Sequence, residues 1–182
     1  MNHDTPAPDG AQQTSAAVAR ETASGADAAQ QGAPTDHRTT RLADTVAALL
    51  AYRTADPTEE AFRLRMLDLS AVAGDPFSRA WNPPGHFTAS AFVLSPDERQ
   101  LLLIRHRKLQ RWLQPGGHFE EEDRDVEAAT RREVAEETGL SAMSPLHSGL
   151  FDVDVHTIPA HGDDPAHAHF DLRMAFRAHT WQ

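Results

Sequence analysis

The order of four strand-like segments around one acidic helical segment constrains the fold of this chain most strongly. The runs HFTASAFVL from His86 and QLLLIRH from Gln100 are rich in β-forming residues, and the turn sequence SPDER separates them. After the polar stretch Glu120–Glu137, strand-like composition returns in LFDVDVHTI from Leu150 and HFDLRMAF from His169. The order strand, strand, helix, strand, strand predicts an α/β sandwich with a mixed sheet.

Two of these segments differ in their expected burial. QLLLIRH is a continuous apolar run, which is typical of a strand buried on both faces. In the last segment apolar and polar residues alternate, which predicts a strand with one buried face. The expected buried residues are Phe170, Leu172, Met174 and Phe176, and the polar ones are His169, Asp171 and Arg173.

The chain before residue 84 divides into a tail and a helical segment. Residues 1–40 have only Met1 and Val18 as sizeable apolar side chains, so we expect a disordered tail. Residues 41–83 predict two helices that pack on the domain formed by residues 84–182. The first helix would bury Leu42, Val46, Leu49 and Leu50, and the second would bury Phe62, Met66 and Leu69. Asp56 would cap the second helix, with Pro57 at its first position.

Composition excludes several classes of protein and site. The absence of cysteine excludes disulfides, thiolate zinc sites and cysteine nucleophiles. A formal net charge of -10 argues against a nonspecific nucleic-acid binder. No apolar run approaches the roughly 20 residues of a membrane span, and the amino terminus lacks a signal pattern. We therefore expect no membrane partner and a cytoplasmic location.

The acidic segment Gly116–Leu140 concentrates the residues that can support chemistry. A helix from Arg124 or Asp125 to Thr138 would place three carboxylates on one arc of its surface, namely those of Glu133, Glu136 and Glu137. Carboxylates at this spacing repel each other, and a hard divalent cation such as Mg²⁺ or Mn²⁺ can compensate that repulsion. The alternative is a solvated acidic helix, which is the common state of Glu-rich stretches.

Neighbouring residues favour the metal site over the solvated helix. Arg132 can hold one of the carboxylates through a bidentate pair. Gly116 and Gly117 allow a tight turn whose backbone approaches a metal or a phosphate, and Gly139 can end the helix in the left-handed conformation.

The acidic segment resembles the signature of the Nudix hydrolase family. Arg132–Leu140 matches every position of the second half of that signature. In the first half, Gly117 is followed by five residues and then by Asp123, where the family has Glu, and eight residues instead of seven separate Asp123 from Arg132. The resemblance extends over roughly His86–His179, including the run RHRKLQRWLQPGGH.

The resemblance implies a Nudix-type α/β/α sandwich. A Nudix domain usually continues with a further strand and a closing helix, whereas this sequence stops at Gln182. We therefore expect either that these C-terminal elements are missing or that the helices before His86 close the sandwich.

The resemblance also implies an activity, which is metal-dependent hydrolysis of a pyrophosphate bond in a small molecule, a nucleoside diphosphate linked to another moiety. The implied ligands of Mg²⁺ or Mn²⁺ are Glu133, Glu136, Glu137 and the Gly117 carbonyl. Arg132 would orient the cluster, and Glu136 or a later residue such as Asp171 would be the general base. Substrate contacts are expected from His118, Asp123 and Asp171. A homodimer is left open.

Two further features have alternative interpretations. His167, His169 and Asp171 would share one strand face, where they could bind zinc or iron, or act as exposed polar partners of a half-buried strand. Trp112 could stack on a base or plug the sheet edge. We favour the polar-partner and plug interpretations.

Two other functions fit the same fold. A diphosphate isomerase usually employs a reactive cysteine, which this chain lacks. A nucleotide sensor commonly loses signature glutamates and often lies beside a DNA-binding domain. All three glutamates are present here and no winged-helix segment is visible, so catalysis is favoured.

Overall fold

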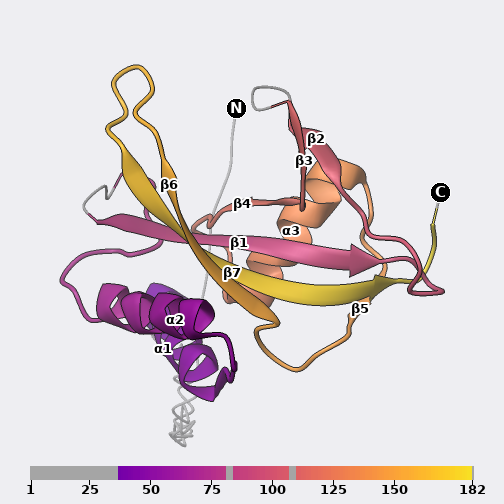
Figure 1. The fold of residues 1–182 in the computed structure, drawn as a ribbon, viewed down its shortest axis with the longest axis horizontal. Coiled ribbons are helices and arrows are strands. Elements are labelled where there is room, and N and C mark those ends of the chain that lie inside the picture. Colours follow the sequence, from indigo (N-terminus) through magenta and orange to yellow (C-terminus); the bar gives the residue numbers. More distant parts are fainter. Residues whose placement is uncertain (1–36, 81–83, 107–109, 182) are drawn as a thin grey trace, which may run out of the picture. The chain divides into compact units, whose positions relative to one another are not determined.

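The computed structural model describes residues 37–80, 84–106 and 110–181 (Figure 1). The helices are α1 (His37–Ala51), α2 (Pro57–Ser70) and α3 (Val126–Thr138). The strands are β1 (Gly85–Leu94), β2 (Ile104–His106), β3 (Arg111–Leu113), β4 (Gly116–His118), β5 (Met143–Pro145), β6 (Asp152–Ile158) and β7 (His167–Ala178). Most of the predicted tail lies outside the described residues, and α1 begins inside it, at His37.

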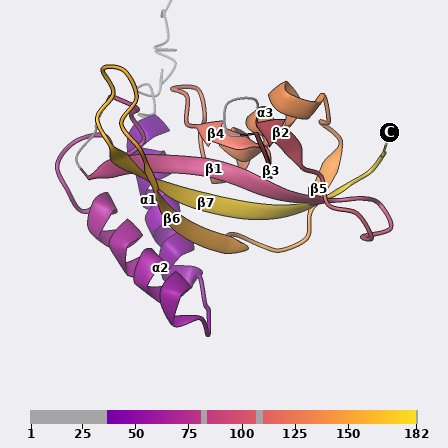
Figure 2. The ribbon, with the colours of Figure 1, turned by 45° about the horizontal axis from the view of Figure 1, so that its top comes forward.

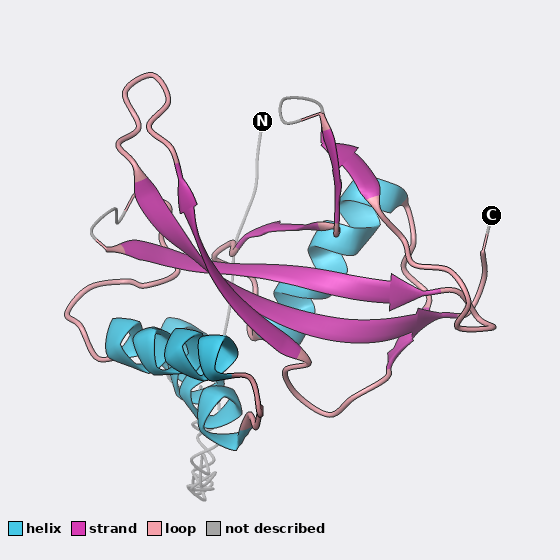
Figure 3. Cartoon of the chain, viewed as in Figure 1, coloured by secondary structure: helices cyan, strands magenta, loops and turns pink. Residues whose placement is uncertain are grey.

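The main sheet is mixed, as the sequence predicts. β1 pairs in parallel with β7 along its whole length, from Gly85 opposite Ala168 to Leu94 opposite Arg177. β4 adds to the other side of β1, while β6 and β5 pair with successive parts of β7, all three antiparallel. Together with the three helices of the described residues this gives the expected mixed α/β fold (Figure 3). None of the helices in the described residues is long and apolar enough to span a membrane.

Apolar and polar side chains alternate along β1 and β7, so the sheet has one apolar face and one polar face. The apolar face contains Phe87, Ala89, Ala91, Val93, Phe170, Leu172, Met174 and Phe176, all of them buried. α2 and α3 both reach this face, because the Arg65 guanidinium lies over the Phe170 ring and that of Arg131 over the Phe176 ring. The predicted buried stripe of β7 is therefore confirmed.

The interpretation of QLLLIRH as a strand buried on both faces is wrong. Leu101 forms only an isolated bridge with Leu94, and Leu101 and Leu103 keep 42% and 37% of their surface exposed. The chain then leaves the main sheet, and β2 pairs with β3 in a separate hairpin. In Figures 1 and 2 this hairpin lies on the side of the long strands where α3 is found. Apolar composition alone did not reveal this departure.

The second predicted helix is confirmed, including its start. The Asp56 side chain accepts a hydrogen bond from the Thr58 amide, and Pro57 occupies the first turn. Met66 and Leu69 are buried, and Phe62 packs partly buried against the same core.

The first helix exists, but the predicted buried stripe is wrong in part. Leu49 is buried, whereas Leu50 keeps 55% of its surface exposed. The buried line instead runs through Arg41, Thr45 and Leu49, at a spacing of four residues. The face of the helix that packs on the protein is therefore the one that carries Arg41, and not the one predicted from its leucines.

Arg41 joins α1 to the loop that follows β4. Its Nη1 donates to the carbonyl oxygens of Glu120 at 2.6 Å and Asp123 at 2.9 Å. The guanidinium carbon lies 4.5 Å from the centroid of the Phe77 ring and 5.5 Å from that of Phe119. Only 4% of Arg41 is exposed, so these interactions are shielded from water.

We predict that Arg41→Met lowers the free energy of unfolding by about 2–4 kcal/mol, because two carbonyl groups lose a charged donor inside the protein. Urea denaturation of the full chain measures this loss. Arg38→Met on the same helix is the matched control, since the Arg38 side chain is 60% exposed and lies 3.9 Å from Asp75. Surface pairs of this kind contribute about 0–1 kcal/mol. Equal losses in the two variants would contradict the anchoring role of Arg41.

Candidate active site

Helix α3 has the limits that the sequence predicts. The Asp125 side chain caps the amino end by accepting from the Ala128 amide at 2.7 Å. At the other end Gly139 adopts a φ of 75°, and its amide donates to the Ala135 carbonyl. These caps fix where α3 starts and stops.

Arg132 is the centre of the polar interactions on α3. Its Nε and Nη2 bind the two carboxylate oxygens of Asp123 at 3.1 and 2.8 Å, as a bidentate pair. Its Nη1 donates to Glu133 Oε1 at 3.0 Å and to Glu136 Oε2 at 3.1 Å. One guanidinium thus holds the loop carboxylate and two helix carboxylates in fixed directions.

Asp123 connects this centre to the preceding loop. The residue is 4% exposed, and its Oδ2 also accepts from the Glu120 amide at 2.8 Å. Arg132 Nη2 reaches the His118 carbonyl at 2.8 Å, at the end of β4. The structure therefore places Asp123 as a partner of Arg132, and not as a group that faces an open surface.

The two glycines of β4 bring the strand against the glutamates of α3. A Cβ added to Gly117 would lie 2.5 Å from Glu133 Oε1, so this carboxylate fills the space that a side chain would take. The Gly116 amide donates to Glu137 Oε2 at 3.0 Å. Glu136 joins the group through Arg132. The three predicted glutamates and Gly117 are therefore brought together.

Negative charge exceeds positive charge in this group. Arg132 lies within 4 Å of four carboxylates, those of Glu120, Asp123, Glu133 and Glu136. Burial raises the pKa of Glu133, Arg132 opposes that rise, and the charges of Glu136 and Glu137 add to it. Hydrogen bonding to Asp123 raises the pKa of Arg132 above its usual value, so it stays charged. A further cation beside these carboxylates would be stabilised.

Asp171 does not join the glutamates. Its carboxylate accepts from Thr88 Oγ1 at 3.0 Å, Ser90 Oγ at 2.7 Å and Arg173 Nε at 2.8 Å, and it is 6% exposed. Gly117 pairs with Ala89, whereas Asp171 pairs with Thr88, the preceding residue of β1. Successive residues of a strand face opposite sides, so the Asp171 side chain lies on the other face of the sheet from the carboxylate of Glu133 that fills the space beside Gly117. The expectation that the polar residues of β7 are solvent-exposed is wrong for Asp171.

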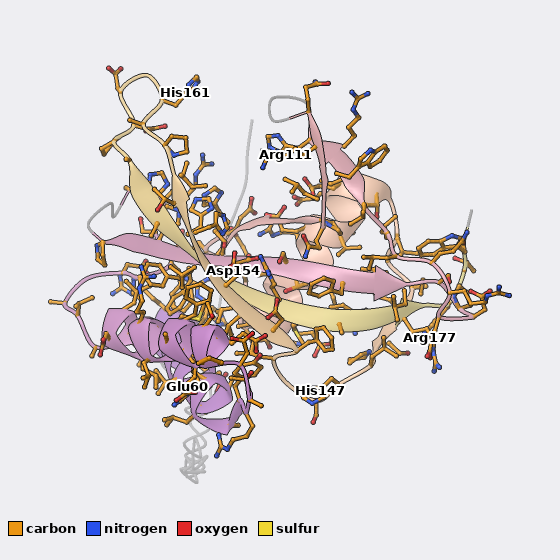
Figure 4. The ribbon with its side chains drawn as sticks, viewed as in Figure 1. Glu60, Arg111, His147, Asp154, His161 and Arg177 are labelled. Atoms are coloured by element: carbon orange, nitrogen blue, oxygen red, sulfur yellow. The ribbon has the colours of Figure 1, made fainter. Side chains whose placement is uncertain are left out.

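The Asp171 carboxylate belongs to a network of charges on the polar face. Arg173 also donates from Nη1 to Asp152 and from Nη2 to Asp154, at 2.8 and 2.9 Å. Figure 4 labels Asp154 in the middle of the sheet. This network ties β6 to β7, and Asp171 already accepts three of its hydrogen bonds.

The His118 side chain lies on this polar face too, while its carbonyl group faces Arg132. The His118 ring centroid lies 5.0 Å from those of His86 and His169. Burial is the main reason that the pKa of His118 falls to about 4 and that of His169 to about 3. Both imidazoles are therefore neutral at neutral pH.

Two features of the site differ from the sequence analysis. Trp112 keeps 64% of its surface exposed, so the interpretation that it plugs the sheet edge is wrong. His86 joins His167 and His169, where the sequence indicated Asp171 as the third residue. The alternation within β7 identified two of these histidines. Nothing in the sequence showed that the first residues of β1 and β7 lie opposite each other.

The sequence was compared with known protein families and with curated proteins. The model of the NUDIX domain family matches residues 84–177, which is more than half of the chain. No curated protein resembles the sequence closely enough to count as a match.

Several solved structures are similar to the chain. An Ap4A hydrolase from C. elegans has 15% identity and a TM-score of 0.38, over 51% of this chain and 69% of its own. A NUDIX family hydrolase from Clostridium perfringens has 28% identity and a TM-score of 0.38, over 53% and 70%. Shewanella oneidensis NrtR has 20% identity and a TM-score of 0.30, over 50% and 41%.

The family match covers β1, β4, α3 and most of β7, and it includes Arg132, Glu133, Glu136 and Glu137. The chain belongs to the NUDIX domain family.

Proposed function

We propose that this chain hydrolyses a pyrophosphate bond in a nucleoside diphosphate linked to another moiety, and that it requires Mg²⁺ or Mn²⁺. The observation that supports this proposal best is the grouping of the three signature glutamates by the glycines of β4 and by Arg132. Glu133 lies against Gly117, Glu137 accepts from the Gly116 amide, and Glu136 is held by Arg132.

The residues of this group fit a hard divalent cation. Glu133, Glu136, Glu137 and the Gly117 carbonyl would hold it, and all of these donors are oxygen atoms. Gly117 has no side chain between its backbone and the Glu133 carboxylate, which leaves the backbone close to the charged group. When bound, the cation neutralises phosphate charge and lowers the pKa of water.

Arg132 would act as the orienting residue. Its two bonds from Nη1 fix one oxygen each of Glu133 and Glu136, while Asp123 clamps the rest of the guanidinium. The carboxylates are therefore preorganised before a substrate arrives, which limits the reorganisation needed during the reaction. Replacing Arg132 by Lys would lose the bidentate pair.

Glu136 is the general base that the geometry favours. Its Oε2 is bound to Arg132, so its Oε1 is the atom that would accept a proton from the attacking water. The Glu136 side chain is 55% exposed, which lets it reach water. Asp171, the alternative base, has its carboxylate engaged by three donors on the opposite face of the sheet.

Hydrolysis assays with and without metal test the proposed reaction. The untreated chain should hydrolyse at least one member of a panel of nucleoside triphosphates, nucleotide sugars, dinucleoside polyphosphates, ADP-ribose, coenzyme A and capped RNA. Chelation should abolish turnover, and added Mg²⁺ or Mn²⁺ should restore it. Full turnover in the presence of chelator would refute the metal requirement.

We predict that Glu136→Gln and Glu137→Gln each lower turnover by about 10²-fold or more, because each removes a charge that acts in the transition state. Folding should survive, since removing one of several crowded carboxylates relieves repulsion in the metal-free protein. Steady-state kinetics and thermal melting measure the two effects separately.

Glu127→Gln is the control for these variants. Glu127 lies on the same helix about 120° around from Glu133, and its carboxylate pairs with Arg131 at 2.8 Å. This variant should lose at most about 0.5 kcal/mol of stability and little turnover. If Glu127→Gln reduced turnover as much as Glu136→Gln, the glutamates would have no specific role.

The neighbouring glycines should respond differently to the same change. In Gly117→Ala the three atoms nearest to the new Cβ all belong to the end of the Glu133 side chain, so we predict a lower rate with little loss of stability. In Gly116→Ala the new Cβ would lie 2.6 Å from the Ala89 carbonyl oxygen and 2.7 Å from the Ser90 Cα. Both are backbone atoms of β1, so they cannot move freely. We expect that variant to lose about 2–3 kcal/mol of stability. Equal melting temperatures for the two variants would contradict this geometry.

A further inference from the structure

Five histidines gather on the polar face of the sheet, on the opposite side of β4 from the Glu133 carboxylate. They come from four strands and are His86, His118, His156, His167 and His169. The strand register brings them together, because His169 of β7 lies opposite both His86 of β1 and His156 of β6. Residues directly opposite each other in a sheet share a face, so these rings must meet.

Three of these histidines have ligand atoms close enough to surround one ion. His86, His167 and His169 each offer a ring nitrogen, and these nitrogens all lie within 4.8 Å of one another. Zinc–nitrogen bonds of about 2.0–2.1 Å in a tetrahedral site place the donors roughly 3.4 Å apart. Small rotations of the three rings would therefore close the group around a metal.

The hydrogen bond made by His167 leaves one ring nitrogen suited to a metal. Its Nδ1 lies 2.9 Å from the Pro165 carbonyl oxygen. A carbonyl oxygen only accepts, so Nδ1 carries the proton and, in the neutral ring, Nε2 has the lone pair. Metal-bound histidines commonly donate their second nitrogen to a backbone carbonyl in this way.

We propose that His86, His167 and His169 bind a divalent transition metal of the zinc class, at a site separate from the glutamate group. Three imidazole nitrogens suit Zn²⁺ and its neighbours in the transition series, whereas Mg²⁺ and Mn²⁺ prefer oxygen donors. Three protein ligands leave a fourth position for water or another small ligand. The two sites would lie on opposite faces of the sheet and take different metals.

Calorimetric titration of ZnCl₂ into the full chain, tag-free and freed of metal, tests this site. The buffer contains excess Mg²⁺, which occupies oxygen sites without competing for imidazole. We expect one Zn²⁺ per chain, and a rise in melting temperature of about 5–10 °C at a free Zn²⁺ concentration of 100 times Kd. Absence of binding, or a midpoint that excess Mg²⁺ shifts strongly, would overturn the proposal.

Substitutions of the histidines test which residues bind Zn²⁺. His167→Ala and His169→Gln should each weaken Zn²⁺ binding by more than about tenfold. Replacing a residue that only hydrogen-bonds to a metal ligand already costs about 10–100-fold in affinity, and removing the ligand itself should cost more. His147→Ala is the matched control, since this histidine is exposed on the loop between β5 and β6 (Figure 4). It should bind Zn²⁺ as the unmodified chain does, and so should Glu136→Gln.

Melting curves without zinc keep these measurements interpretable. His167 lies near the start of β7 and is partly exposed, so His167→Ala should retain the fold and decides the result if His169→Gln unfolds. Unchanged affinity in folded His167→Ala would overturn the proposal. So would loss of binding in Glu136→Gln, which would assign the ion to the carboxylates.

Discussion

The Arg132 guanidinium is the interaction on which the organisation of the glutamate site depends. It binds Asp123 through two hydrogen bonds, reaches the His118 carbonyl, and donates to Glu133 and Glu136. Without this cation the helix would present carboxylates that repel each other at close spacing. Arg132 is the common partner of the loop carboxylate, the end of β4, and the side chains of Glu133 and Glu136. The cost of gathering negative charge is thereby reduced before any metal binds.

The sheet separates two kinds of chemistry, because successive side chains of a strand point to opposite faces. On one side, Gly117 lets the Glu133 carboxylate approach the backbone of β4. On the other, His118 joins the histidines of β1 and β7. Two adjacent residues of one short strand therefore belong to an oxygen-donor group and a nitrogen-donor group. These groups lie close together but differ in the metals that they favour.

The first helix, α1, also helps to position the site. Arg41 donates to the carbonyls of Glu120 and Asp123, so α1 holds the loop that in turn holds Arg132. The sequence did not indicate this role. A buried arginine on a helix contradicts the usual preference for apolar residues, and its partners are backbone atoms about 80 residues away. Leu50 is exposed for the same reason, because the helix is rotated to bury Arg41.

The sequence by itself determined the elements whose causes are local. The caps of α2 and α3, the alternation of β7 and the signature Arg132–Leu140 depend on residues within a few positions of each other. Tertiary structure decided which strands became neighbours, and so placed His86 beside His169 and buried Asp171 between Thr88 and Ser90. It also turned QLLLIRH away from the main sheet. Strand pairing joins residues far apart in the chain, and the pattern within one strand does not identify which distant strand becomes its neighbour.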